Sequence, residues 1–147
     1  MNISIIGLLH NHVLLSGLTA WIAAQILKGV IYAVIHGHFD LSRLTGDGGM
    51  PSGHSATVTS VAVCCGLNYG LDSAIFGLSL ILAIITCHDA MHARNQIGKQ
   101  AALLNELFAH HEQPPSLEEF VGHTPLQVLA GILLGILVGL VMNLLIL

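Results

Sequence analysis

Four consecutive residues, Pro51-Ser52-Gly53-His54, combine a helix-start signal with groups that bind an anion and move a proton. Proline is favoured in the first turn of a helix, where the exposed N–H groups and the helix dipole attract anions. Gly53 would let an oxyanion approach the backbone closely, and the Ser52 hydroxyl adds a hydrogen-bond donor. His54 would then exchange a proton beside the anion. The same pattern also describes a helix cap whose histidine faces the membrane headgroups.

A second segment, residues 122–127, repeats this order of residue types: a glycine, then His123, then a Thr-Pro helix start. Two histidines at two helix N-termini fit phosphoryl transfer, with one as the nucleophile and the other as the general acid. Gln127 follows His123 by one helical turn, so its side chain can hydrogen-bond the imidazole and fix its tautomer.

Lys28 lies in an otherwise apolar stretch of the chain. A cation inside a membrane costs about 2.5–3.5 kcal/mol on insertion scales, which makes Lys28 a functional candidate. The alternative is that its side chain extends toward the headgroups. Gln25, three residues earlier, is a second polar candidate on the same helical face.

The densest group of polar residues lies between His88 and Arg94. His88 and His92 are four residues apart with Asp89 between them, a spacing that can bind a divalent metal. The sequence fixes no third strong ligand. Arg94 is suited to clamp a phosphate with two parallel hydrogen bonds, while Asp89 balances its charge.

Apolar segments must position these residues. Of the 147 residues 54% are hydrophobic and 8% are charged, and the mean hydropathy is +0.79. A membrane-spanning helix needs about 20 apolar residues. We therefore expect one all-α domain over residues 1–147, a polytopic membrane bundle of about four transmembrane helices. The expected spans are residues 13–35, 52–69, 71–91 and 124–147, of which the second is short and rich in small residues and should lie inside the bundle.

Alternation of the four spans brings distant polar residues to one membrane face. The first and third spans end on that face, and the second and fourth begin there. The residues that share it are Lys28, Ser52, His54, Asp89, Arg94 and His123. The polar segment after the third span has Ala101, Leu104 and Phe108 at helical spacing, which predicts an amphipathic interfacial helix.

The composition excludes other classes of protein. A formal charge of −4 with four basic residues gives no nucleic-acid footprint. The N-terminal residues carry no Lys or Arg, so we expect them to be part of the mature protein rather than a signal peptide. The cysteines fall in apolar spans and are expected to be packing residues: Cys64, Cys65 and Cys87.

Glycines recur at every fourth position of the last span, at Gly131, Gly135 and Gly139. This stripe predicts close packing against another helix. Two such small bundles could also complete one another's walls as a homodimer.

Three ordered motifs, "GGMPSGHSA", "DAMHARNQIGKQAALLN" and "GHTPLQVLAGILLG", follow "AQILK" over nearly the whole chain. Together they resemble the small divergent branch of the type 2 phosphatidic acid phosphatase and vanadium haloperoxidase superfamily, found in bacteria and plants. The resemblance implies that Lys28 binds phosphate and that Ser52 and Gly53 cradle it. It also implies that His54 is the general acid and that His123 becomes phosphorylated, with no metal or other cofactor required.

The chain departs from the wider superfamily at three positions. That superfamily has an arginine seven residues after the lysine and another six residues before the second histidine, where this chain has Ile35 and Leu117. It has an aspartate four residues after that histidine, where this chain has Gln127. Arg94 coincides with an arginine typical of the divergent branch. A neutral Gln127 can orient His123 but cannot stabilise its imidazolium form as a carboxylate would.

The leading interpretation is a membrane phosphatase that hydrolyses a lipid phosphate or polyprenyl diphosphate through a phosphohistidine. One alternative is a binder of anionic lipid headgroups without turnover. Another is a metal-binding or transport bundle built on His88, Asp89 and His92. The protein would lie in a bacterial inner membrane or a plastid membrane. The basic residues all fall on the active face: Lys28, Arg43, Arg94 and Lys99. The positive-inside rule makes that face cytoplasmic. The alternative is an extracytoplasmic site, as in relatives of the wider superfamily.

Overall fold

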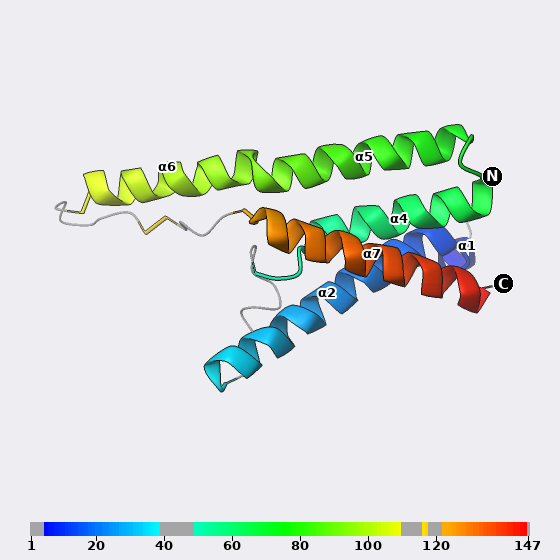
Figure 1. Ribbon diagram of the computed structural model, residues 1–147, viewed down its shortest axis with the longest axis horizontal. Helices are drawn as coiled ribbons and strands as arrows, with labels where there is room; N and C mark the ends of the chain where they lie inside the picture. Colours follow the sequence, from blue (N-terminus) through cyan, green and yellow to red (C-terminus); the bar gives the residue numbers. More distant parts are fainter. Residues whose placement is uncertain (1–4, 39–48, 110–115, 118–121, 147) are drawn as a thin grey trace.

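The described part of the computed structural model, residues 5–38, 49–109, 116–117 and 122–146, is helical and contains no strand (Figure 1). The expectation of an all-α membrane bundle is confirmed. The helices are α1 (Ile5–Leu9), α2 (His12–His36), α4 (Gly53–Tyr69), α5 (Ala74–Met91), α6 (Ala93–Leu107) and α7 (Pro125–Ile146).

Three helical stretches of the described chain are long and apolar enough to cross a membrane: His12–His36, Ala74–Leu107 and Pro125–Leu145. Helix α4 is shorter, with 17 residues. Its length of about 25 Å falls short of the roughly 30 Å of a bilayer core. It packs against α2, α5 and α7, so the other spans surround it. This matches the expectation that the second span lies inside the bundle.

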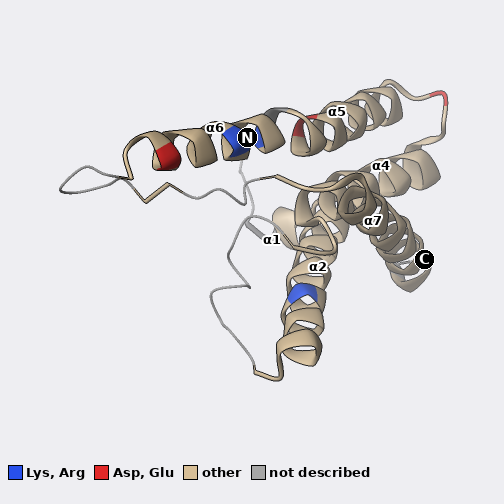
Figure 2. Ribbon diagram, turned by 60° about the vertical axis from the view of Figure 1, so that its left-hand side comes forward, with Lys and Arg blue, Asp and Glu red and all other residues tan. Residues whose placement is uncertain are grey.

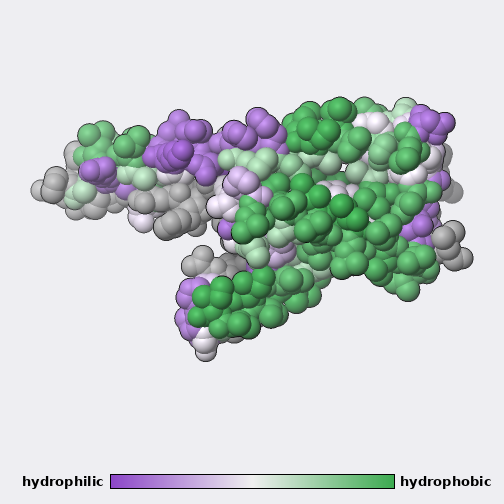
Figure 3. Space-filling view, in the orientation of Figure 1, coloured by the Kyte–Doolittle hydropathy of each residue, from purple (hydrophilic) through white to green (hydrophobic). Residues whose placement is uncertain are grey.

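The bundle buries small side chains and exposes large apolar ones. Among the described residues, the largest fully buried side chains are cysteines and serines. The outer surfaces of α2, α5 and α7 carry leucines such as Leu78, which is 74% exposed (Figure 3). The charged residues of the described segments fall on one turn of α2, on α5 and α6, and in the α4–α5 turn (Figure 2). This distribution suits a surface solvated by lipid.

The glycine stripe of α7 lies directly on α4. A Cβ atom at Gly131 would lie 2.5 Å from the Ser52 carbonyl oxygen, and one at Gly135 would lie 2.5 Å from that of Ala56. A Cβ at Gly139 would approach the Val63 Cβ to 2.9 Å. The two backbones therefore touch over about two turns, and the predicted close packing is confirmed.

Helix α2 also packs closely against α4. A Cβ at Gly17 would lie 2.8 Å from Val61 Cγ2. The hydroxyls of Ser16 and Ser60 are 2.6 Å apart, and Ser60 also donates to the Ser16 carbonyl at 3.1 Å. Both serines are fully buried, so this reciprocal pair satisfies their polar groups inside an apolar contact.

Two local predictions need adjustment. Pro51 does not lie in the first turn of α4, because Ser52 is the N-cap and its hydroxyl accepts from the Ser55 N–H. Pro125, by contrast, is the first residue of α7. The expected amphipathic helix is present as α6, which continues the direction of α5 beyond the bundle (Figure 1). Its placement at the membrane surface stays a prediction.

The Gly135→Ala substitution should destabilise the bundle by about 1–3 kcal/mol, because the new methyl group would press on the α4 backbone. Gly77→Ala is the matched control, since no atom lies within 4 Å of a Cβ at that position on α5. Alanine there should raise stability by up to about 1 kcal/mol through its helix propensity. Reversible unfolding in mixed detergent micelles measures both changes. Equal effects of the two substitutions would contradict the packing described here.

Candidate active site

Two backbone hydrogen bonds fix the start of α7 against its neighbours. The His123 N–H donates to the Ala90 carbonyl of α5 at 3.0 Å, and the Ser52 N–H donates to the Gln127 carbonyl of α7 at 3.0 Å. The N-termini of α4 and α7 therefore lie side by side, close to the end of α5. The aligned dipoles of the two helices make this end of the bundle favourable for an anion.

The two sequence-predicted histidines meet at this place. The ring centroids of His54 and His123 are 6.4 Å apart, with the planes tilted by 59°. His54 is exposed on the first turn of α4, whereas His123 is only 4% exposed. One small anion placed between the rings would contact both.

The hydrogen bonds of Gln127 define the tautomer of His123. The Thr124 N–H donates to Gln127 Oε1 at 3.0 Å, so that atom is an acceptor. His123 Nδ1 lies 3.3 Å from the same oxygen and must therefore carry its proton toward it. The neutral imidazole then has its lone pair on Nε2, the atom available as a nucleophile.

The same glutamine completes a capping box. Its own N–H donates to Thr124 Oγ1 at 3.4 Å, so residues 124–127 satisfy each other at the start of α7. Sequence reasoning recognised the contact with His123 but missed this second role. The Thr-Pro-Leu-Gln spacing was the signal for it.

Two cations lie beside the segments that lead into the two histidines, Lys28 next to Gly49 and the backbone of Arg94 next to Gly122. Lys28 is 8% exposed, and a Cβ on Gly49 would lie 3.7 Å from the Cδ of its side chain. Gly49 has φ +83°, a conformation that favours glycine, so the loop before α4 can pass close to the lysine. Arg94 is half-buried and lies with Nε 3.8 Å from Asp89 Oδ2.

Burial lowers the pKa of His123 below the 6.5 of an unperturbed histidine. The hydrogen bond to Gln127 opposes this shift, while the charges of Lys28, His54 and Arg94 add to it. At neutral pH the His123 ring is therefore uncharged and inside a positive field.

Ser52 and Gly53 take structural positions at the start of α4. Ser52 is fully buried, and its hydroxyl accepts from the Ser55 N–H at 3.3 Å and the Ser55 hydroxyl at 3.0 Å. Gly53 is buried beside Trp21, whose Cδ1 would lie 3.6 Å from an added Cβ. Contact of either residue with phosphate stays a prediction.

The metal cluster considered as an alternative does not assemble among the described residues, which contain no group of three or more His, Cys, Asp or Glu able to hold an ion. His88 and His92 stack with their centroids 4.2 Å apart and their planes at 13°. Asp89 faces Arg94 instead of completing a ligand set. The alternative of a metal-binding or transport bundle therefore gains no support here.

The two positions at which the superfamily has arginines do not face the site. Ile35 is 70% exposed, two turns beyond Lys28 on α2. The backbone of Leu117 is hydrogen-bonded to the Asn105 side chain, at 2.9 Å through its carbonyl and 3.0 Å through its N–H. Asn105 lies about 16 Å beyond Arg94 along α6.

Gln25, the remaining polar candidate of α2, has a buried side-chain oxygen that accepts no hydrogen bond from any described residue. Arg43 lies outside the described residues.

The fold and this end of the bundle define a helical membrane protein with two histidines at paired helix N-termini and two cations on neighbouring helices. Residues 9–138 match the Divergent PAP2 family, and the chain belongs to this family. It is 40% identical over 147 aligned residues to the uncharacterized membrane protein YuiD of Bacillus subtilis (strain 168), covering 86% of this chain and 93% of that protein. No solved structure is a significant match. The family resemblance predicted from the motifs is thereby confirmed.

Two substitutions should move the pKa of His123 in opposite directions. Lys28→Met removes a cation that disfavours the imidazolium, so the pKa should rise. Gln127→Leu removes an acceptor that stabilises the imidazolium, so the pKa should fall further below 6.5. NMR titration of labelled histidines in detergent measures both, with His123→Ala to assign the resonance. Shifts of the same sign in the two variants would contradict the site described here.

Proposed function

We propose that this protein is a membrane phosphatase that hydrolyses a lipid phosphate or polyprenyl diphosphate through a phosphohistidine. The observation that carries the proposal is the pairing of a buried His123, with its Nε2 lone pair available, and an exposed His54 whose ring centroid lies 6.4 Å away. Family membership supports a relation to phosphatases. The apolar outer surface supports a substrate drawn from the membrane.

In the proposed reaction His123 Nε2 attacks phosphorus while the bond from phosphorus to the lipid oxygen breaks. Protonated His54 gives its proton to that leaving oxygen, so an alcohol, or a monophosphate from a diphosphate, departs. Neutral His54 then takes a proton from water as the water oxygen attacks the phosphohistidine. The phosphorus–nitrogen bond breaks, inorganic phosphate leaves, and both histidines return to their starting states.

The remaining groups would hold the phosphoryl oxygens. Lys28 acts as a point charge from α2, and Arg94 offers a planar set of donors from α6. The positive ends of the α4 and α7 helix dipoles add to this attraction. Each of these groups stabilises the additional negative charge of the transition state more strongly than the ground state.

One observation favours a second candidate, a binder of anionic lipid headgroups that does not turn over. The group that orients His123 is the neutral Gln127, which supports the imidazolium less than a carboxylate does. The same cations and helix N-termini would still hold the headgroup.

Detergent-purified protein should release inorganic phosphate from at least one member of a panel of lipid phosphates and polyprenyl diphosphates. EDTA should leave the rate unchanged, and orthovanadate should inhibit it. His123→Ala should abolish release, and His54→Ala should lower it by about 10²–10⁴-fold through loss of the general acid. His36→Ala is the matched control, because His36 lies at the exposed end of α2 outside the site.

Three outcomes would contradict the phosphatase. Loss of release in EDTA would point to a metal-dependent route. Equal rates for His123→Ala and His36→Ala would exclude the histidine nucleophile. Saturable binding of a lipid phosphate without release from any substrate would establish the second candidate.

We place the site on the cytoplasmic side of the membrane, because Lys28, Arg94 and Lys99 lie at the site end of the spans. In intact bacterial cells an impermeant maleimide should label Asp72→Cys, in the exposed α4–α5 turn, and not Gln100→Cys on exposed α6. Permeabilisation should make Gln100→Cys reactive. The reverse labelling pattern would place the site outside the cytoplasm. The native cysteines are buried, which keeps the background low.

A further inference from the structure

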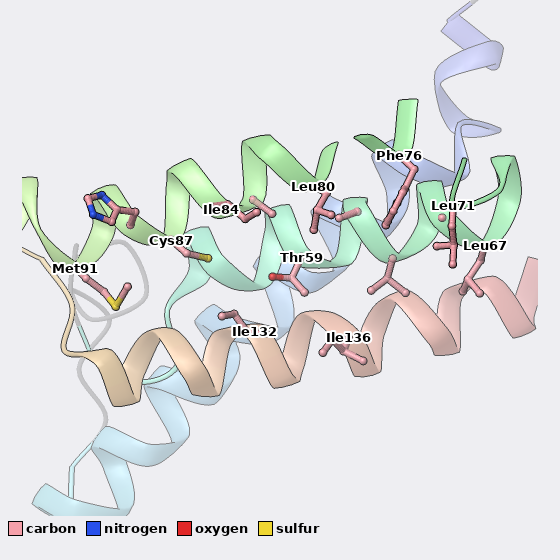
Figure 4. A pocket seen from close by; sticks show the side chains of 15 residues that line it. Thr59, Leu67, Leu71, Phe76, Leu80, Ile84, Cys87, Met91, Ile132 and Ile136 are labelled. Atoms are coloured by element: carbon pink, nitrogen blue, oxygen red, sulfur yellow. The ribbon is translucent and has the colours of Figure 1, made fainter. Parts of the chain in front are cut away.

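An apolar groove of about 690 Å³ runs between α4, α5 and α7 (Figure 4). Its lining comes from all three helices and from Leu71 in the α4–α5 turn. Apart from Thr59 and His88, the lining consists of hydrocarbon, glycine and sulfur-containing residues. Such a surface offers nothing to an ionic group and much to a hydrocarbon chain.

The groove approaches the candidate active site. One end is formed by Met91 and Cys87 near the end of α5. Met91 follows Ala90, the residue whose carbonyl accepts the hydrogen bond from the His123 N–H at 3.0 Å. Ala90, Cys87 and Val128 also form one buried cluster with Met91 packed against it. A molecule with its phosphate at His123 would therefore have the start of its chain at the mouth of the groove.

We infer that this groove holds the hydrocarbon chain of the lipid whose phosphate occupies the His54–His123 site. The inference rests on the proposed function and adds where the substrate's tail lies. The lining extends from Met91 to Phe76, about 22 Å along α5. This exceeds the roughly 15 Å depth of one leaflet's hydrocarbon, half of the bilayer core. A single long chain that passes the bilayer midplane fits this length.

The first test is the dependence of phosphate release on chain length in a matched pair of variants. Leu80 lines the groove about 16 Å from Met91 along α5, and Figure 4 shows its side chain among the lining residues. Leu80→Trp should fill the groove at that depth. The control is Ile81→Trp, because Ile81 is the next residue, is 56% exposed and does not line the groove.

Leu80→Trp should lower kcat/KM for long-chain substrates relative to short-chain ones, by about tenfold for every two methylenes displaced. Ile81→Trp should leave that ratio at the wild-type value. Equal ratios in both variants, with turnover intact, would overturn the inference and leave the phosphatase standing.

The second test reads binding and does not require turnover. A lipid phosphate with a diazirine near the end of its chain is photolysed with the purified protein, and adducts are mapped on α5. We expect adducts at Leu80 and Ile84, both in the groove lining, and not at Ile81. An unlabelled lipid phosphate should displace the probe, and the corresponding lipid alcohol should not.

Three outcomes would overturn the inference in this second test. Adducts spread evenly over Ile81 and Ile84 would show no preference for the groove. Equal displacement by the alcohol would show that the groove holds bulk lipid. Adducts that bridge two copies of the chain would show that a second copy closes the groove. Groove adducts displaced by lipid phosphate, in a protein that releases no phosphate from any substrate, would support the groove and refute the phosphatase.

Discussion

The close contact between α4 and α7 is the constraint on which the rest of this bundle depends. Lipid solvates leucine as well as another helix does, so spans associate through close packing and polar pairs rather than through hydrophobic burial. Glycines every fourth residue on α7 let its backbone rest on the Ser52, Ala56 and Ser60 side of α4. The Ser16–Ser60 pair holds α2 against the same helix. Small residues thus make α4 the centre of the structure although it is the shortest of the four packed helices.

That contact also sets the chemistry. Because α4 and α7 touch from their first turns onward, their N-termini lie together, and the residues that begin them become neighbours. The Ser52-to-Gln127 hydrogen bond fixes the relative height of the two helices. His54 and His123 then face each other without belonging to a common helix or loop. A shift of α7 by one turn along α4, about 5.4 Å, would separate them.

Hydropathy and residue spacing were enough to predict the spans, because each stretch is either long and apolar or bounded by turn residues. The predicted 52–69 became α4 (Gly53–Tyr69), and 124–147 became α7 (Pro125–Ile146). Alternation of the spans along the chain also predicted that Lys28, His54, Arg94 and His123 lie at one end of the bundle.

The burial of individual residues could not be predicted in this way. Ser52 was expected to offer a donor, yet it is fully enclosed as a cap, because the path of α7 over it is set by distant glycines. The apolar groove depends on the same tertiary geometry, so no local sequence pattern predicts it.

The structure shows what the three departures from the superfamily pattern, at positions 35, 117 and 127, change near His123. Ile35 is exposed two turns beyond Lys28, and Leu117 is held at Asn105 on α6, so their departure from arginine leaves the contacts of His123 unchanged. The change to Gln127 is different, because it touches the imidazole directly. With a neutral partner, His123 is kept unprotonated by burial and by Lys28, His54 and Arg94.

On the proposed function, those cations also bind the phosphate. The same charges therefore keep the His123 nucleophile unprotonated and attract the phosphate that it attacks. The negative charge of a bound phosphate would offset the positive field of these cations and so raise the basicity of His123 Nε2. This rise would come with the substrate in place, when the Nε2 lone pair faces phosphorus instead of solvent. Such coupling would let a site without a carboxylate partner activate its histidine when substrate is present.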